Sequence, residues 1–280
     1  MELSHQYLAR KGCELRRLVV EAIGVGHRGH FGGALSAADL VACLYFHTLR
    51  HRPHEPRWPD RDRFLLSKGH AAPVQYAALA LAGYFPVADL PSLKELGCHL
   101  QGHPDTLRTP GVEANTGALG QGLSLANGMA IAAKHDGRPT RCFVIIGDGE
   151  LGEGQIWEAA MFSAARRLDN VCALIDHNGI QATGPTRDRM DIGVIPEKWR
   201  AFGWHTLEID GHNPAAIVAA LDEAATIRGQ PTAIIARTVK GKGISFAENT
   251  AAFHNNELNA DQYRAAVAEL DRALAALSQP

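Results

Sequence analysis

Two side chains with oxygen ligands stand in glycine-containing turns of this 280-residue chain. Asp148 lies in Gly147-Asp148-Gly149, and Asn178 precedes a glycine thirty residues later. A carboxylate and an amide oxygen are hard ligands that suit Mg²⁺ or Ca²⁺, and the backbone carbonyl of Ile180 could supply a third. The flanking glycines would let a bulky anion such as a diphosphate approach the backbone. Either sequence alone is explained by ordinary turn formation, so a metal site is indicated only if the two turns meet.

The stretches in front of the two turns predict that they do. Residues 141–146 and 171–176 are apolar and rich in β-branched side chains, which favours two buried strands. Between them, residues 154–168 carry apolar side chains at helical spacing. In a strand–helix–strand unit the strands lie parallel, and here we expect them side by side, so their carboxyl ends reach the same edge of the sheet. That edge is where open α/β sheets bind ligands.

The rest of the chain repeats this alternation and predicts an α/β fold. We expect a mostly parallel sheet with helices on both faces. The predicted helices cover residues 4–23, 36–50, 71–82, 120–136, 154–168, 213–228 and 258–277. The predicted strands cover residues 63–66, 141–146, 171–176, 204–209 and 232–239. We predict one domain over 1–280, with a helical tail from about 258 to 280.

Composition excludes several classes of partner. Apolar residues make up 46% of the chain and the formal net charge is −2, which gives no reason to expect nucleic acid or an anionic membrane. No apolar run approaches membrane-spanning length. The five cysteines are scattered without a Cys-x-x-Cys pair, which favours a reducing, cytoplasmic compartment over a disulfide framework.

Five of the fourteen histidines directly follow a glycine. In such a loop an imidazole can bind an anion or move a proton, although a surface-loop histidine is the more frequent case for any single pair. Each pair lies near a predicted element end, so several of them could converge on one cleft. The five are His27, His30, His70, His103 and His212.

One glycine motif is a false lead. Residues 24–29 match the dinucleotide fingerprint G-x-G-x-x-G. That motif requires a strand before it and an acidic residue about 20 positions later. Here a predicted amphipathic helix precedes it and the later region offers no carboxylate, so we exclude a nicotinamide dinucleotide site.

The Gly-Asp-Gly turn followed by Asn178 resembles the thiamine-diphosphate-binding motif. Four further stretches resemble the amino-terminal half of transketolase, in the same order along the chain. They are "GHFGGALSAADLVACLYF" (29–46), "DRFLLSKGHAAPVQYAALALAGYF" (62–85), "GHPDTLRTPGVEANTGALGQGLSLANGMA" (102–130) and "TVKGKGISFAEN" (238–249). The resemblance spans roughly residues 5 to 260. It is closer to the short amino-terminal subunits of split, two-chain transketolases.

This resemblance implies ligands for thiamine diphosphate and for Mg²⁺ or Ca²⁺. The metal ligands would be Asp148, Asn178 and the carbonyl of Ile180. The cofactor would contact His70, Gly117, Ala118, Leu119, Asp148, Gly149, Asn178 and His254. We interpret Lys240 and Lys242 as loop cations and leave them out of the site.

The resemblance also implies the reaction. A two-carbon ketol unit would pass from a ketose, or a ketose phosphate, to an aldose. His30 and His103 would bind substrate hydroxyls and assist proton transfer, and His254 would also face the reacting centre. Glu153 would couple the two active sites of a dimer. Phe31 and Phe253 depart from the residues frequent in the family, which puts the usual sugar phosphates in doubt and leaves a specialised pathway open.

In the family, a glutamate on a second, pyrimidine-binding domain completes the cofactor site, and the resemblance stops before that domain. We therefore expect activity only with a separate carboxy-terminal subunit, in an α2β2 heterotetramer. Two alternatives stay open. One is another thiamine-diphosphate enzyme, such as a deoxyxylulose-phosphate synthase, which pyruvate would identify as donor. The other is a regulatory binding module without chemistry.

Overall fold

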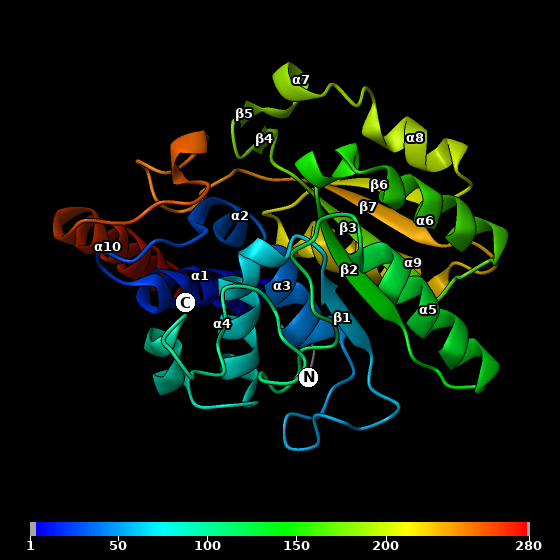
Figure 1. The fold of residues 1–280 in the computed structure, drawn as a ribbon, viewed down its shortest axis with the longest axis horizontal. Helices are drawn as coiled ribbons and strands as arrows, with labels where there is room; N and C mark the ends of the chain where they lie inside the picture. Colours follow the sequence, from blue (N-terminus) through cyan, green and yellow to red (C-terminus); the bar gives the residue numbers. More distant parts are fainter. Residues whose placement is uncertain (1–3, 279–280) are drawn as a thin grey trace.

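Five strands form the central sheet of the computed structural model, which describes residues 4–278. Their order is β1-β2-β3-β7-β6, and every neighbouring pair is parallel (Figure 1). The strands are β1 Arg63–Leu66, β2 Cys142–Gly147, β3 Val171–His177, β6 His205–Asp210 and β7 Thr232–Arg237. The predicted α/β fold with a parallel sheet is confirmed; residues 1–3 and 279–280, including the end of the predicted tail, lie outside the described residues.

Helices cover both faces of the sheet. They are α1 His5–Ile23, α2 Phe31–Ser36, α3 Ala38–Cys43, α4 Ala72–Ala82, α5 Gly122–His135, α6 Gly154–Ala165, α7 Thr186–Arg189, α8 Ile195–Ala201, α9 Pro214–Thr226 and α10 Ala260–Leu277. The shorter pieces include a π-helix at Leu44–Thr48, and β4 Ile180–Gln181 paired with β5 Gly184–Pro185. There are also 3₁₀ helices at Gly69–Ala71, Val87–Ser92, Gly149–Gly152 and Ala251–Phe253.

Alternation along the strands divides the core into two layers. Phe143 and Ile145 of β2 pack with buried side chains of α1, α3, α4 and α9. Val144 and Ile146 point to the other face and pack with α5, α6 and α8. Successive side chains of a strand point to opposite faces, so a strand that is apolar throughout must be covered on both.

The structure corrects the predicted helix at 36–50. The helical region begins five residues earlier, at Phe31, and is divided into α2, α3 and the π-helix. Gly32 in α2 has a packing role: a β-carbon there would lie 2.9 Å from Lys240 Cε. Helix α8 and the β4–β5 hairpin were not predicted.

The glycines of residues 24–29, which match the dinucleotide fingerprint, follow a helix, as the sequence predicted. This helix is α1, and no strand precedes the glycines within the described residues. Among those same residues, no helix is both long enough and apolar enough to cross a membrane.

Candidate active site

The tips of β2 and β3 bring the two predicted turns together. Gly147 and Asp176 are register partners at the carboxyl ends of the two strands, so the expected adjacency is confirmed. Asp148 follows β2, and its carboxylate accepts hydrogen bonds from the backbone N–H of Gly149 at 2.8 Å and of Gly179 at 2.5 Å. The second of these bonds joins the Asp148 turn directly to the Asn178 turn.

Asp148 has the environment of a cation ligand. Its side chain is buried, and no ion pair among residues 4–278 includes it. Burial, and then the nearby carboxylate of Asp176, raise the pKa of Asp148. A positive ion beside this carboxylate would offset both effects. In the adjoining turn after β3, the amide oxygen of Asn178 accepts from Ile180 N at 3.1 Å. No group of three or more His, Cys, Asp or Glu side chains in the described part of the chain could hold a metal, and the candidate set uses only one carboxylate.

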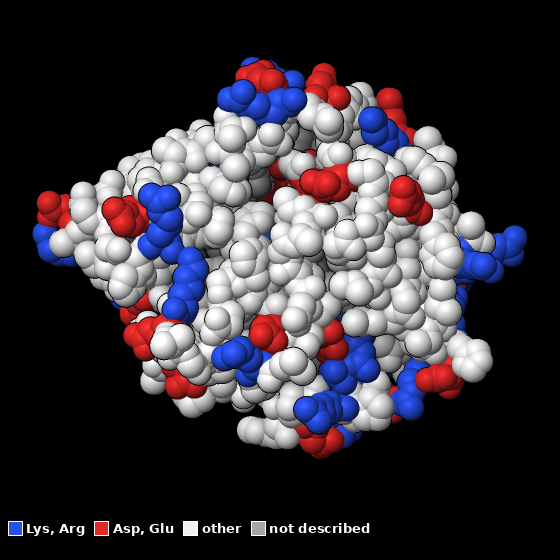
Figure 2. Space-filling model, viewed as in Figure 1, with Lys and Arg blue, Asp and Glu red and all other residues white. Residues whose placement is uncertain are grey.

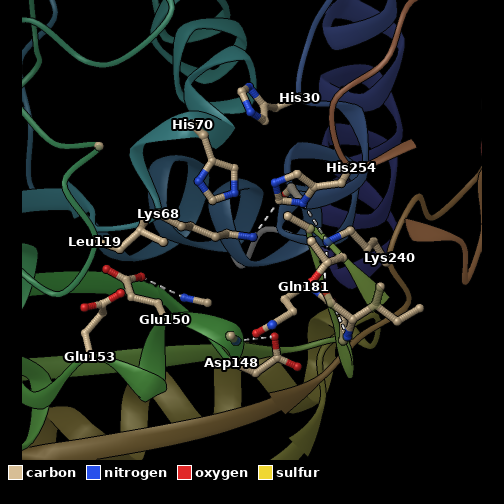
Figure 3. A pocket seen from close by; sticks show the side chains of 18 residues that line it. His30, Lys68, His70, Leu119, Asp148, Glu150, Glu153, Gln181, Lys240 and His254 are labelled. Carbon is tan, nitrogen blue, oxygen red and sulfur yellow. Dashed lines mark hydrogen bonds between the residues drawn. The ribbon is translucent and has the colours of Figure 1, made fainter. Parts of the chain in front are cut away.

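A cavity of about 440 Å³ opens at this edge of the sheet (Figure 3). Ten of the predicted site residues line it: His30, His70, Gly117, Leu119, Asp148, Gly149, Glu153, Asn178, Ile180 and His254. Ala118 and His103 are not among the residues that line it. In Figure 3 the histidines lie on one side of the cavity, and Asp148, Glu150 and Glu153 lie on the other.

The predicted histidines form one cluster. The ring centroid of His30 lies 5.0 Å from that of His70, 5.4 Å from that of His254 and 6.4 Å from that of His103. The rings of His70 and His254 are also 5.0 Å apart. Three of the five Gly-His pairs therefore converge with His254, whereas His27 is exposed and His212 lies in a separate buried cluster.

These imidazoles are held neutral. Burial, followed by the charge of Lys94, lowers the pKa of His30 to about 4. Burial, then Lys68, lowers the pKa of His70 to about 2, and burial, then Lys240, lowers that of His254 to about 3. The pKa of His103 is lowered too, by burial and then Lys94. A neutral imidazole has one donor and one acceptor nitrogen, so the cluster can bind hydroxyls and relay protons.

Lys240 was left out of the site as a loop cation, but it lines the cavity. Its side chain is buried, and its ammonium donates to the Ile180 carbonyl at 2.7 Å and lies 3.0 Å from His254 Nδ1. Burial, then the charge of Lys68, lowers the pKa of Lys240 to about 8. Lys242 fits the original interpretation: it is half-buried and lies 3.7 Å from a Glu248 carboxylate oxygen.

Three further buried polar residues were missed. Lys68 pairs with Asp176 and donates to the Gly33 carbonyl at 2.7 Å. Burial acts to raise the pKa of Asp176, but the charge of Lys68 and several hydrogen bonds lower it overall. Glu150 accepts from Ser67 Oγ at 2.5 Å and from Gly120 N at 2.8 Å, which ties the β2 tip to the loop before α5. The one available signal was their position: Lys68 lies two residues after β1, and Asp176 is the second-last residue of β3.

Glu153 lies at the rim of the cavity and is exposed in this single chain. It directly precedes helix α6. A residue that meets a second chain would have this exposure before assembly.

Comparison with known proteins shows that the chain is similar to transketolases. Residues 11–273 match the family model described as transketolase, thiamine diphosphate binding domain. The 6-deoxy-6-sulfo-D-fructose transketolase subunit of Clostridium sp. (strain MSTE9) is 49% identical over 258 residues, which are 92% of this chain and 94% of that protein. An apulose-4-phosphate transketolase subunit of Actinobacillus succinogenes is 41% identical, over 96% of this chain and 97% of its own length.

Solved structures of transketolases are also similar to this chain. The transketolase of Pichia stipitis, determined as a variant in complex with fructose 6-phosphate, superposes with a TM-score of 0.87 at 30% identity. The match covers 98% of this chain but 44% of that one. The chain thus corresponds to nearly the whole of the two subunits and to less than half of this longer transketolase.

Proposed function

The chain belongs to the transketolase family, in its thiamine-diphosphate-binding domain, and we propose that it is the cofactor-binding subunit of a two-chain transketolase. It would transfer a two-carbon ketol unit from a ketose to an aldose. The observation that carries this proposal is the cavity in which a cluster of neutral histidines faces the oxygen ligands at the β2 and β3 tips. Residues 1–280 would form one diphosphate- and metal-binding domain with α10 as its tail.

The donor set fits Mg²⁺ or Ca²⁺ with a diphosphate. Asp148, Asn178 and the Ile180 carbonyl would hold the metal. His70, Lys240 and the backbone of Gly149 would contact the diphosphate, where the ammonium supplies a charge that a neutral imidazole lacks. The predicted contacts of Gly117, Ala118, Leu119 and His254 with the cofactor remain part of this proposal. When bound, thiamine diphosphate supplies a nucleophilic carbon and an electron sink for cleavage of the ketose carbon–carbon bond.

The histidines of this chain would bind the sugar substrate. His30, His103 and His254 would bind its hydroxyl groups and accept or return protons at them. Their depressed pKa values keep each ring available as an acceptor at neutral pH. Lys68 lines the same cavity and is paired there with the buried Asp176.

We propose that the substrate is a ketose with an anionic end group. One relative is named for a sulfonated ketose and another for a ketose phosphate. Which of the two groups this chain accepts depends in part on the partner, because the family places its sugar-phosphate cations outside this domain.

A separate carboxy-terminal subunit would complete the site, in an α2β2 heterotetramer. Two relatives of nearly the same length as this chain are themselves named as subunits. Glu153 at the rim would meet the second half of the assembly. Five free cysteines, four of them buried, agree with a reducing compartment, and we propose the cytoplasm.

A donor–acceptor screen of the reconstituted complex tests the function. We expect Mg²⁺- and thiamine-diphosphate-dependent transfer from ketoses bearing phosphate or sulfonate, and negligible turnover by this chain alone. Turnover with pyruvate in place of a ketose would instead identify a synthase of the deoxyxylulose-phosphate type. Absence of cofactor uptake by the complex in calorimetry would leave only a regulatory role.

A further inference from the structure

A second cluster of buried polar side chains lies behind the cavity. Arg16 of α1 forms two hydrogen bonds with Asp39 of α3, Nη1–Oδ1 at 3.0 Å and Nη2–Oδ2 at 2.5 Å. His212, in the loop after β6, brings Nδ1 to 2.7 Å from Asp39 Oδ2. At most 14% of any of these three side chains is exposed. None of the three lines the proposed active site.

The hydrogen bonds define the tautomer of His212. Its Nε2 lies 2.8 Å from the backbone nitrogen of Val239. A backbone N–H can only donate, so Nε2 must accept. Nδ1 then carries the proton of the neutral ring and donates it to Asp39, an arrangement in which a carboxylate fixes the orientation of an imidazole.

Val239 directly precedes Lys240, whose ammonium lies in the cavity. That ammonium is 2.7 Å from the Ile180 carbonyl and 3.0 Å from His254 Nδ1. Val239 follows the end of β7, so no ladder hydrogen bond of the sheet fixes its N–H. The Thr238 N–H just before it donates to the His177 carbonyl at 3.1 Å, and the Val239 N–H donates to His212 Nε2, so His212 is the partner that fixes this amide where the backbone enters the cavity.

Neighbouring contacts limit how the segment can move. Gly241 N donates to the Gly32 carbonyl at 3.1 Å, and Asn249 N donates to the Lys240 carbonyl at 2.9 Å. These two bonds hold the backbone of residues 240–241 against Gly32 and Asn249. On the side of β6, Gly211 N donates to the Arg237 carbonyl at 2.8 Å, which places His212 opposite Val239.

We propose that His212 is a positioning residue that sets the place of the Lys240 ammonium through the backbone of Val239. This inference rests on the proposed function, in which Lys240 contacts the diphosphate. Asp39 and Arg16 fix the orientation of the His212 ring. The ring fixes the Val239 amide, and the backbone at Val239 sets the position of the Lys240 ammonium. His212 touches neither the cofactor nor the sugar, so it would act on cofactor affinity and leave the chemical step unchanged.

Two substitutions of His212 distinguish the role of Nδ1 from that of Nε2. In His212→Asn, the amide nitrogen can still donate to Asp39, but nothing reaches Val239. In His212→Gln, the longer side chain can offer its oxygen to Val239 N–H. His205→Asn is the matched control, because His205 lies on the edge strand β6 and pairs with Glu223 at the surface.

The first readout is the Kd of thiamine diphosphate with Mg²⁺, measured by calorimetry on the complex assembled with its partner subunit. We expect His212→Asn to weaken binding about tenfold, as removal of an indirect partner of a ligand does. His212→Gln should restore most of the affinity, and His205→Asn should match the unmodified protein. At saturating cofactor, kcat should change less than about twofold. Inorganic diphosphate with Mg²⁺, used as a second probe, should give the same order of affinities.

A purely structural role predicts a different pattern. It would lower the melting temperature of both His212 variants without the difference in Kd between them, and that result would overturn the proposal. If His212→Asn does not fold, hydrogen exchange at the Val239 amide is measured in His212→Gln instead. A protected amide together with a native Kd supports the proposal. An unprotected amide together with a native Kd contradicts it. Failure of the unmodified complex to bind either probe would instead reject the proposed function.

Discussion

Asp148 is a buried carboxylate that none of the described lysines, arginines or histidines neutralises by an ion pair. Its pKa is raised by burial and then by Asp176, so the charged form has an energetic cost in the chain without metal. The neighbouring Asp176 is neutralised by Lys68. The two carboxylates lie at the carboxyl ends of adjacent strands, yet among the described residues only the one that lines the cavity has no ion-pair partner, which is the arrangement of a ligand site.

Replacing Asp148 by Ala should abolish Mg²⁺-dependent binding of thiamine diphosphate to the assembled complex. We expect the Kd to rise by on the order of 100-fold or more, since even indirect metal partners are worth about 10- to 100-fold. Calorimetry with and without EDTA measures the change. Asp136→Ala, at the exposed end of α5, is the control and should bind normally. Retained affinity in Asp148→Ala would remove this residue from the metal site.

The histidine cluster should make the chain sensitive to acid. The pKa of His30 is lowered from 6.5 to about 4 and that of His254 to about 3. Well above pH 6.5 both rings are neutral in the folded and unfolded chain and add no pH dependence. As the pH falls from 6.5 toward 4, the unfolded chain binds protons that the folded chain does not, so the free energy of unfolding decreases.

Urea denaturation at about pH 7.5 and about pH 5 would measure this decrease. The double substitution His30→Asn with His254→Asn should reduce the difference between the two pH values. His135→Asn is an exposed control and should leave the difference unchanged. An equal pH dependence in the double variant would show that these rings are not the source of the acid sensitivity.

At the scale of elements, Gly12 and Gly128 form a matched pair of helix glycines. A β-carbon at Gly12 in α1 would lie 2.1 Å from Asp39 Oδ1, an atom that Arg16 holds in place. A β-carbon at Gly128 in α5 would meet nothing within 4 Å. Gly12→Ala should therefore lower the free energy of unfolding by about 1–3 kcal/mol, as overpacking does. Gly128→Ala should raise it by about 0.5–1 kcal/mol, because alanine favours helix.

Thermal and urea denaturation of this chain would measure both glycine variants. If Gly12→Ala were as stable as the unmodified chain, the Arg16–Asp39 pair would be less rigid than the structure shows, and the fixed orientation of His212 would lose its support.

The sequence predicted the elements that form the sheet better than the connections that shape the cavity. The strands before Asp148 and Asn178 are long and uniformly apolar, so their positions and the meeting of their tips followed from pattern alone. The strand order, with β7 between β3 and β6, depends on packing that no local pattern encodes. Helix α8 is short, and β4 and β5 contain two residues each, which leaves too few residues for any periodicity.

Lys240 shows why part of the site escaped prediction. A lysine in a glycine-rich stretch is usually a solvated surface cation. Its burial depends on the fold of the whole segment, including Gly241 at φ 76° and the space left by Gly32. Both glycines are visible in the sequence, but their purpose appears only when the strand that precedes Lys240 is placed beside β3.

At the scale of the whole molecule, helices α5 and α6 present an apolar surface to solvent. Leu125, Met161 and Phe162 are 41%, 51% and 41% exposed. Figure 2 shows few charged side chains over these two helices, while Lys, Arg, Asp and Glu gather elsewhere on the same face. Glu153 lies just before α6, so the same surface adjoins the rim of the cavity. Exposed apolar surface of this kind is typical of an assembly interface, which fits the proposal that a partner subunit completes the site.

Replacing Met161 by Asp should therefore weaken assembly without unfolding the chain. An introduced carboxylate would be desolvated at the interface but hydrated in the free chain, where Met161 is already exposed. We expect sedimentation of the complex to shift from α2β2 toward smaller species, with the melting temperature of the isolated chain unchanged. Val87→Asp, at a residue 40% exposed in a short 3₁₀ helix away from α5 and α6, is the control and should assemble normally. An intact α2β2 complex with Met161→Asp would place the interface on another face, and Glu153 would then lose the role that its position beside α6 suggests.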